Sequence, residues 1–324
     1  MCGIVGYIGD REAADFLMDG LAKLEYRGYD SAGIAVYNDG AIAVRKKAGR
    51  LVNLAEEVKA HPVVGTLGIG HTRWATHGGP SDVNAHPHTD EKGNFAIVHN
   101  GIIENYMELK EELLKKGYHF KSETDTEVVA HLCADMYDGD FTSTVRKVLV
   151  RLRGSYSLVF MCKFEPDKII CSKKDNPLIV GLGQGENYIA SDIPAILSYT
   201  RKTYIMNDGE IAIVMKDNVW VTDLEGKPIS KKVFEVNWDA EAAEKGGFEH
   251  FMLKEIYEQP KAIKDTMSCR ITKDGKHVHF EELNWTPEDV KSIGKILITA
   301  CGTAYHAGLL AKYFIEKLAR IPVE

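Results

Sequence analysis

Alternating apolar and polar positions predict short strands over most of the chain, with a few amphipathic helices between them. Residues 3–8 (Gly-Ile-Val-Gly-Tyr-Ile) form the first predicted strand, and residues 11–25 place apolar side chains at helical spacing. The same patterns predict strands at 66–70, 95–99, 156–162, 168–171 and 177–180, and helices at 105–116, 124–137 and 141–153. Strands and helices do not alternate regularly, which favours antiparallel sheets with helices on their outer faces.

Two turn sequences predict β-hairpins. Asn38-Asp39-Gly40 and Asn207-Asp208-Gly209 are each flanked on both sides by short apolar runs. Asp-Gly in that setting favours the tight turn that joins neighbouring antiparallel strands. Each pair of flanking runs is therefore expected to pair as a hairpin.

The chain is expected to hold about two domains, because 324 residues exceed one typical core. Residues 2–239 carry the strand-rich pattern, and residues 240–290 are polar and helix-prone, as in a connector. Residues 291–324 then begin an α/β domain, with an apolar strand at 295–300 and a helix over Tyr305–Arg320. One strand and one helix cannot bury their own apolar faces, so the chain is expected to stop inside this second domain.

Composition and charge argue against several classes of protein. The net charge is −7 and no Lys/Arg-rich run is present, so nucleic-acid binding is not expected. No apolar stretch approaches the roughly 20 residues of a membrane-spanning helix, and the N-terminal sequence lacks the basic leader of a signal peptide. A cytoplasmic protein is therefore expected. The six cysteines show no close pairing such as C-x-x-C, which argues against a disulfide framework or a zinc site.

Cys2 directly follows the initiator Met1, and its side chain is small enough for the methionine to be removed. Removal leaves a thiol and a free α-amine on one residue. The amine has a reference pKa of about 8, so a neutral fraction exists at pH 7 that can accept the thiol proton. A nucleophile activated by its own N-terminal amine is a known catalytic arrangement. Taken alone, a cysteine at this position is better explained by chance.

Two further segments place polar groups at the ends of predicted strands. The run His71-Thr72-Arg73-Trp74-Ala75-Thr76-His77-Gly78 follows an apolar strand, and an arginine there could hold a carboxylate by two parallel hydrogen bonds. His99-Asn100-Gly101 ends the strand at 95–98. An asparagine amide beside a glycine N–H can supply the two donors that an oxyanion needs.

Other segments have two interpretations. The run Ser122-Glu123-Thr124-Asp125-Thr126-Glu127 precedes an apolar helix, so Asp125 is either a helix-terminal charge or a receptor for an ammonium group. His86, His88 and Asp90 alternate, as metal ligands can. Their loop-like surroundings favour instead a loop that packs near the active site, without a metal.

Five segments occur in the order of one enzyme family: Cys2-Gly3-Ile4-Val5-Gly6, Glu25-Tyr26-Arg27-Gly28-Tyr29-Asp30-Ser31-Ala32-Gly33, the His71–Gly78 run, Asn100-Gly101-Ile102-Ile103-Glu104-Asn105 and the Ser122–Glu127 run. On these segments the chain resembles the class II glutamine amidotransferases, and within them the branch that transfers nitrogen to fructose 6-phosphate. Lys254-Glu255-Ile256-Tyr257-Glu258-Gln259-Pro260 and Ala300-Cys301-Gly302-Thr303 extend the resemblance through a connector into a sugar-isomerase domain. The resemblance implies an α+β fold, the four-layer αββα sandwich of N-terminal-nucleophile hydrolases.

The resemblance implies a role for each matching residue and no cofactor or metal. Cys2 would attack the side-chain amide of glutamine, with Asn100 and Gly101 stabilising the oxyanion. Arg73 would hold the α-carboxylate of glutamine and Asp125 its α-ammonium. The other residues implied at the site are Thr76 and His77, which line it, Trp74, which gates an ammonia channel, and Arg27 and Gly28, which border the nucleophile. For Trp74 the alternative is core packing.

The resemblance also implies a second half-reaction, in amino-sugar biosynthesis. In the full-length enzyme, expected to be a homodimer, the ammonia converts fructose 6-phosphate to glucosamine 6-phosphate. Cys301-Gly302-Thr303 would contribute to the sugar-phosphate site, where a helix N-terminus and hydroxyls suit an anion. Ala304 stands where a hydroxyl residue often follows, which puts one sugar contact in doubt.

The chain is expected to be a fragment that lacks the rest of that sugar domain, including its imine-forming lysine and its acid–base residues. The chain is therefore expected to hydrolyse glutamine without forming the amino sugar. Two alternatives remain at this point: another class II enzyme such as amidophosphoribosyltransferase, and a non-catalytic module that binds a sugar phosphate.

Overall fold

The computed structural model describes residues 2–237, 248–268, 270–271, 278, 283 and 285–324. Contacts divide the chain into two compact units, Met1–Gly247 and Phe248–Glu324, and each is described by itself. The boundary predicted between residues 239 and 240 lies outside the described residues.

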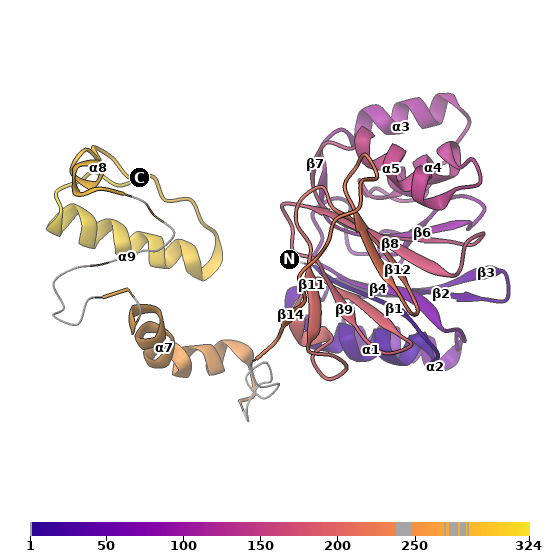
Figure 1. Ribbon diagram of the computed structural model, residues 1–324, viewed down its shortest axis with the longest axis horizontal. Helices are drawn as coiled ribbons and strands as arrows, with labels where there is room; N and C mark the ends of the chain where they lie inside the picture. The colour runs from indigo at the N-terminus through magenta and orange to yellow at the C-terminus, as the bar shows by residue number, and fades with distance from the viewer. Residues whose placement is uncertain (1, 238–247, 269, 272–277, 279–282, 284) are drawn as a thin grey trace. The chain divides into compact units, whose positions relative to one another are not determined.

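Two antiparallel sheets form the centre of the first unit (Figure 1). The eight-stranded sheet has the order β14-β11-β9-β10-β1-β4-β2-β3, and the six-stranded sheet has the order β13-β12-β8-β7-β6-β5. The larger sheet comprises β1 (Gly3–Ile8), β2 (Ser31–Asn38), β3 (Ala41–Ala48), β4 (Leu67–Arg73), β9 (Ile179–Leu182), β10 (Asn187–Ala190), β11 (Lys202–Ile205) and β14 (Phe234–Glu235). The smaller comprises β5 (His88–Thr89), β6 (Phe95–Ile103), β7 (Gly154–Cys162), β8 (Lys168–Lys174), β12 (Ile211–Met215) and β13 (Val219–Thr222).

Helices cover the outer face of each sheet (Figure 1). On the eight-stranded sheet lie α1 (Ala13–Leu24) and α2 (Leu51–Ala60), and on the six-stranded sheet lie α3 (Tyr106–Lys115), α4 (Glu127–Met136) and α5 (Phe141–Arg151). Short 3-10 turns are η1 (Glu25–Arg27) and η2 (Ile193–Ala195). The expected four-layer αββα sandwich is confirmed.

The alternation of side chains along β1 explains how the sheets stack. Val5 and Tyr7 pack against the helices of the outer layer, whereas Ile4 and Ile8 pack between the two sheets. Because successive residues of a strand point to opposite faces, an apolar run buries both faces of the sheet. Burial on both faces places β1, and with it the preceding Cys2, in the middle of the larger sheet.

One predicted hairpin is confirmed and the other is wrong. β2 and β3 pair around Asp39 and Gly40, which both have positive φ angles. Residues 207–209 also form a turn, but it connects β11 of the larger sheet to β12 of the smaller one. The flanking strands find their partners in different sheets, so an Asp-Gly turn here crosses between layers.

The second unit contains three helices within its described residues, α7 (Phe251–Ser268), α8 (Pro287–Lys291) and α9 (Gly302–Leu318). The strand predicted at 295–300 is wrong in extent, because only Ile296 forms a bridge, parallel to Val323. The predicted helix begins at Gly302 rather than Tyr305, so Gly302 and Thr303 lie in its first turn. Among the described residues, no helix combines the length and apolarity needed to cross a bilayer.

Candidate active site

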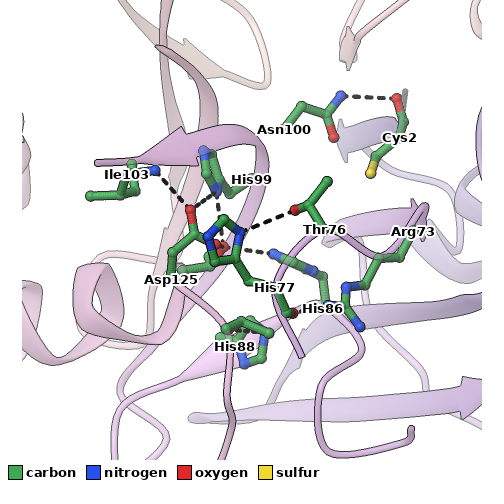
Figure 2. A network of polar contacts seen from close by, with 12 residues as sticks. Cys2, Arg73, Thr76, His77, His86, His88, His99, Asn100, Ile103 and Asp125 are labelled. Atoms are coloured by element: carbon green, nitrogen blue, oxygen red, sulfur yellow. Dashed lines mark hydrogen bonds and ion pairs between the residues drawn. The ribbon is translucent and has the colours of Figure 1, made fainter. Parts of the chain in front are cut away.

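A cavity of about 410 Å³ lies at the start of β1, where the two sheets face each other. It is lined by most of the residues expected at the site: Cys2, Arg27, Arg73, Trp74, Thr76, His77, Asn100, Gly101 and Asp125. Residues from both sheets thus converge on one space (Figure 2).

Cys2 precedes β1 and presents its sulfur to the chain that follows β4. The backbone N–H of Trp74 donates to Sγ at 3.1 Å, and Sγ lies 3.5 Å from the Trp74 carbonyl oxygen. Burial raises the pKa of the Cys2 thiol, and the hydrogen bond from Trp74 partly opposes that rise. A thiol with a raised pKa is mostly protonated near pH 7, so a base is needed to form the thiolate.

Asn100 and Gly101 lie inside β6, which continues to Ile103. The prediction that the strand ends at residue 98 is therefore wrong, because β7 pairs with β6 through these positions. The Asn100 side-chain nitrogen donates to the Cys2 carbonyl oxygen at 3.0 Å (Figure 2). Gly101 has a φ of +129°, and a Cβ there would lie 2.0 Å from the Ser155 carbonyl oxygen. Glycine is thus required where the backbone passes the nucleophile.

Arg73 ends β4 and is only 3% exposed. Its guanidinium donates to the carbonyl oxygens of the loop that follows, at His77 and, at 2.9 Å, at Gly78. Burial lowers the pKa of Arg73, although the group stays cationic. Gly28 lies directly against this backbone, since a Cβ at Gly28 would be 2.7 Å from the Arg73 carbonyl carbon.

Asp125 does not cap the helix that follows it. Thr126 occupies the N-cap position of α4, and the Asp125 carboxylate instead accepts the backbone N–H of Ile103 at 2.7 Å. The residue is 4% exposed and lines the cavity (Figure 2). Asp125 therefore bonds to β6 instead of capping α4, and it is a buried carboxylate that faces the cavity.

The remaining expected residues border the opening of the cavity. Trp74 is 46% exposed and packs edge-to-face on Tyr29, so it is not a core residue. The hydroxyl of Thr76 lies 3.3 Å from Nδ1 of His77. Arg27 pairs with Asp192 and lines the cavity. Burial acts to lower the pKa of Arg27, but the contacts with Tyr26 and Asp192 outweigh it, so the pKa is raised.

Four buried histidines lie beside the cavity, and the sequence did not indicate a role at the site for any of them: His71, His86, His88 and His99. His86 and His99 line the cavity, and their ring nitrogens each lie within 3.0 Å of the Thr126 hydroxyl. Burial lowers the pKa of all four histidines. The expected packing of His86 beside the site is confirmed. The burial of His86 and His88 was not evident from the sequence because the chain around 86–88 lacks a periodic pattern.

No group of three or more potential metal ligands occurs in the part of the chain that the structure describes. Asp90 is used in a turn, where its carboxylate accepts the backbone N–H groups of Asn94 and Phe95. In the second unit, Cys301, Gly302 and Thr303 are exposed at the start of α9, and their sugar-phosphate role stays a prediction.

The fold and the family comparison define the class of this chain. Residues 71–198 match the family described as "Glutamine amidotransferase domain". The sandwich is similar to the glutamine phosphoribosylpyrophosphate amidotransferase from B. subtilis, with 27% identity and a TM-score of 0.60 over 69% of this chain and 49% of that one. The chain therefore contains a class II glutamine amidotransferase domain of the N-terminal-nucleophile type.

Within that class, the chain is similar over its whole length to proteins named glutamine--fructose-6-phosphate aminotransferase [isomerizing]. It is 59% identical over its whole length to glutamine--fructose-6-phosphate aminotransferase [isomerizing] of Caldanaerobacter subterraneus subsp. tengcongensis, covering 53% of that protein. It is 57% identical to the enzyme of the same name from Clostridium tetani, again over the whole chain and 53% of the relative. The chain thus spans about half the length of the curated relatives it matches. The phosphoribosylpyrophosphate enzyme, at 27% identity, is by comparison a distant structural neighbour.

Proposed function

We propose that this chain hydrolyses L-glutamine to glutamate and ammonia, with Cys2 as the nucleophile. The observation that carries the proposal is the position of the Cys2 sulfur, in a cavity lined by a cation, a carboxylate and oxyanion donors. Removal of Met1 leaves the α-amine beside the thiol. Because burial raises the thiol pKa, this amine is assigned as the base that deprotonates Sγ.

The reaction runs in two steps through a thioester. Sγ attacks the amide carbon of glutamine, and the charge on its oxygen is stabilised by the Asn100 side chain and the Gly101 N–H. The protonated α-amine then donates its proton to the leaving nitrogen, which departs as ammonia. Water attacks the γ-glutamyl thioester, the amine takes a proton from that water, and glutamate leaves as the thiol is restored.

Two charged side chains are assigned to the α-carbon end of glutamine. Arg73 would bind the α-carboxylate, since its planar guanidinium suits a carboxylate. Asp125 would bind the α-ammonium with the oxygen that does not accept the Ile103 N–H. Thr76 and His77 would line the same end of the cavity. These assignments explain why a buried cation and a buried carboxylate face one cavity without forming an ion pair with each other.

The full-length protein would pass the ammonia to fructose 6-phosphate, as the names of its relatives indicate. Trp74, exposed and adjacent to the nucleophile, is assigned as the gate to the ammonia channel. Cys301, Gly302 and Thr303 would contribute part of the sugar-phosphate site. The enzyme would act in the cytoplasm as a homodimer.

Glutamate release by the wild-type chain and by Cys2→Ala tests the glutaminase assignment. The substitution is expected to lower kcat by several orders of magnitude, because it removes the covalent nucleophile. Cys162→Ala, which removes a buried thiol from the end of β7, is the control and should retain activity. Equal activity of the wild type and Cys2→Ala would exclude Cys2 as the nucleophile.

A second assay separates the remaining possibilities for the chain. With glutamine and fructose 6-phosphate, it should release glutamate and form no glucosamine 6-phosphate. Formation of the amino sugar would show that the chain supports both half-reactions. Binding of fructose 6-phosphate without any release of glutamate would favour a non-catalytic sugar-phosphate module.

A further inference from the structure

His71 contacts the proposed oxyanion donor from behind and has no role in the mechanism above. It lies on β4, is fully buried, and its Nε2 is 3.0 Å from two oxygens, the His99 carbonyl and the Asn100 side-chain Oδ1. A backbone carbonyl can only accept a hydrogen bond. Nε2 must therefore carry the proton of the neutral imidazole, and it donates to both oxygens.

This tautomer determines which way the Asn100 amide points. An Nε2–H group requires an acceptor opposite it, so the Asn100 oxygen faces His71 and the amino group faces Cys2. The reverse orientation would set the NH₂ group against another N–H donor. We propose that His71 is a positioning residue, which holds the Asn100 amino group toward the carbon that Cys2 attacks.

The surroundings of His71 keep it neutral and in one orientation. Burial lowers the pKa of His71 to about 3, so protonation does not disturb the contact near neutral pH. Its Nδ1 is buried without a hydrogen-bond partner, and its ring lies 4.2 Å from the His86 ring, centroid to centroid. A buried polar atom left unpaired opposes folding. The contact made by Nε2 offers a functional reason for a histidine at this position.

Two substitutions that differ by one methylene test this role, which rests on the proposed glutaminase activity. In His71→Gln the amide nitrogen is as many bonds from Cα as Nε2, so it can still donate to Asn100. In His71→Asn the amide nitrogen corresponds to Nδ1 and cannot reach. We expect His71→Asn to lower kcat for glutamine about 100-fold with KM changed less than about threefold, as for a lost oxyanion donor. His71→Gln should recover kcat to within about fivefold of the wild type.

A double-mutant comparison distinguishes positioning from a general loss of structure. If His71 acts through Asn100, then His71→Asn added to Asn100→Ala should lower kcat by less than about threefold further. Multiplication of the two losses would overturn the proposal, as would wild-type kcat in His71→Asn. Equal losses in His71→Gln and His71→Asn would also overturn it, since only one of them lacks the donor.

The unsubstituted chain provides a test that depends on neither folding of variants nor activity. Nitrogen-15 NMR of the labelled histidines reports which ring nitrogen carries the proton. His71 should show the neutral Nε2–H tautomer at pH 7 and no titration down to about pH 5, as its lowered pKa requires. An Nδ1–H tautomer or an imidazolium at pH 7 would overturn the proposal even if the glutaminase assignment holds. An inactive wild-type chain with the Nε2–H tautomer would refute the glutaminase assignment and the catalytic role of His71 together, while leaving the contact itself established.

Discussion

Asn100 donates its side-chain amide to the backbone carbonyl of Cys2 at 3.0 Å, although 98 residues separate them in the sequence. The bond links β6 of the smaller sheet to the residue that directly precedes β1 of the larger one. The two halves of the proposed site, the nucleophile and the oxyanion donor, are therefore held by the packing of one sheet on the other.

Substitution of Asn100 is expected to affect the chemical step more than binding. Asn100→Ala removes one of two oxyanion donors, so kcat for glutamine should fall about 100- to 1,000-fold while KM changes little. Steady-state glutaminase kinetics measure both constants. Asn53→Ala is the control, because the Asn53 side chain donates only to the Ala48 carbonyl, outside the cavity, and it should retain wild-type kcat.

Asp125→Asn is expected to weaken binding of the α-ammonium group of glutamine. The variant keeps an oxygen that can accept the Ile103 N–H, so the fold should persist, but the negative charge is lost. KM for glutamine should rise at least about tenfold, the effect of losing a charged hydrogen bond. The discriminating measurement compares glutamine with its analogue that lacks the α-amine. The wild type should strongly prefer glutamine, and an equally strong preference in Asp125→Asn would refute the assignment.

Gly101→Ala is expected to destabilise the fold as well as the site. The new Cβ would lie 2.0 Å from the Ser155 carbonyl oxygen, at a φ that side chains rarely adopt. The free energy of unfolding should fall by about 3 kcal/mol or more. Gly93→Ala is the matched control, because Gly93 also has a positive φ but nothing lies within 4 Å of its Cβ position. Denaturant unfolding should show a loss of only about 1 to 2 kcal/mol there, and equal losses in both variants would argue against the steric explanation.

The sequence predicted the local features of this structure better than its long-range pairing. Strand β1 and helices α1, α3 and α5 lie within a few residues of their predicted bounds, because their apolar periodicity is strong. The hairpin predicted at residues 207–209 fails since local turn chemistry does not specify which sheet receives the next strand. Helix α2 was not predicted, and only two of its residues are buried.

In the candidate site, too, local motifs were predicted better than contacts between distant elements. Cys2, Arg73, Asn100 and Asp125 were identified from motifs, and all four line one cavity. The buried histidines behind them were recognised poorly, because a buried histidine is identified by its hydrogen-bond partners, which come from other elements. Asp125 had two interpretations in the sequence, and its contact with distant β6 could not be predicted from local patterns.

The buried histidines should make stability depend on pH. Burial lowers the pKa of His71, His86, His88 and His99 in the folded chain, whereas in the unfolded chain the pKa is about 6.5. Below about pH 6.5 the unfolded chain binds more protons, so the free energy of unfolding should fall as the pH falls. Each histidine contributes a slope of up to about 1.4 kcal/mol per pH unit.

Denaturant unfolding between about pH 7 and pH 5 measures this dependence. His88→Gln should reduce the slope by roughly one quarter, since it removes one of the four titrating groups. His88 bonds to Thr124 and does not line the proposed catalytic cavity, so glutaminase activity gives a separate check on folding. A stability that is flat across this range would show that these histidines are not held neutral.

The most direct test of the Cys2 assignment is to trap the thioester. The chain is mixed with glutamine, quenched in acid and digested, and the N-terminal peptide is weighed by mass spectrometry. The peptide should begin at Cys2, without Met1, and a fraction should carry one glutamyl group on the sulfur, with none in Cys2→Ala. An active chain that retains Met1, or a glutamyl group on any other residue, would contradict the mechanism.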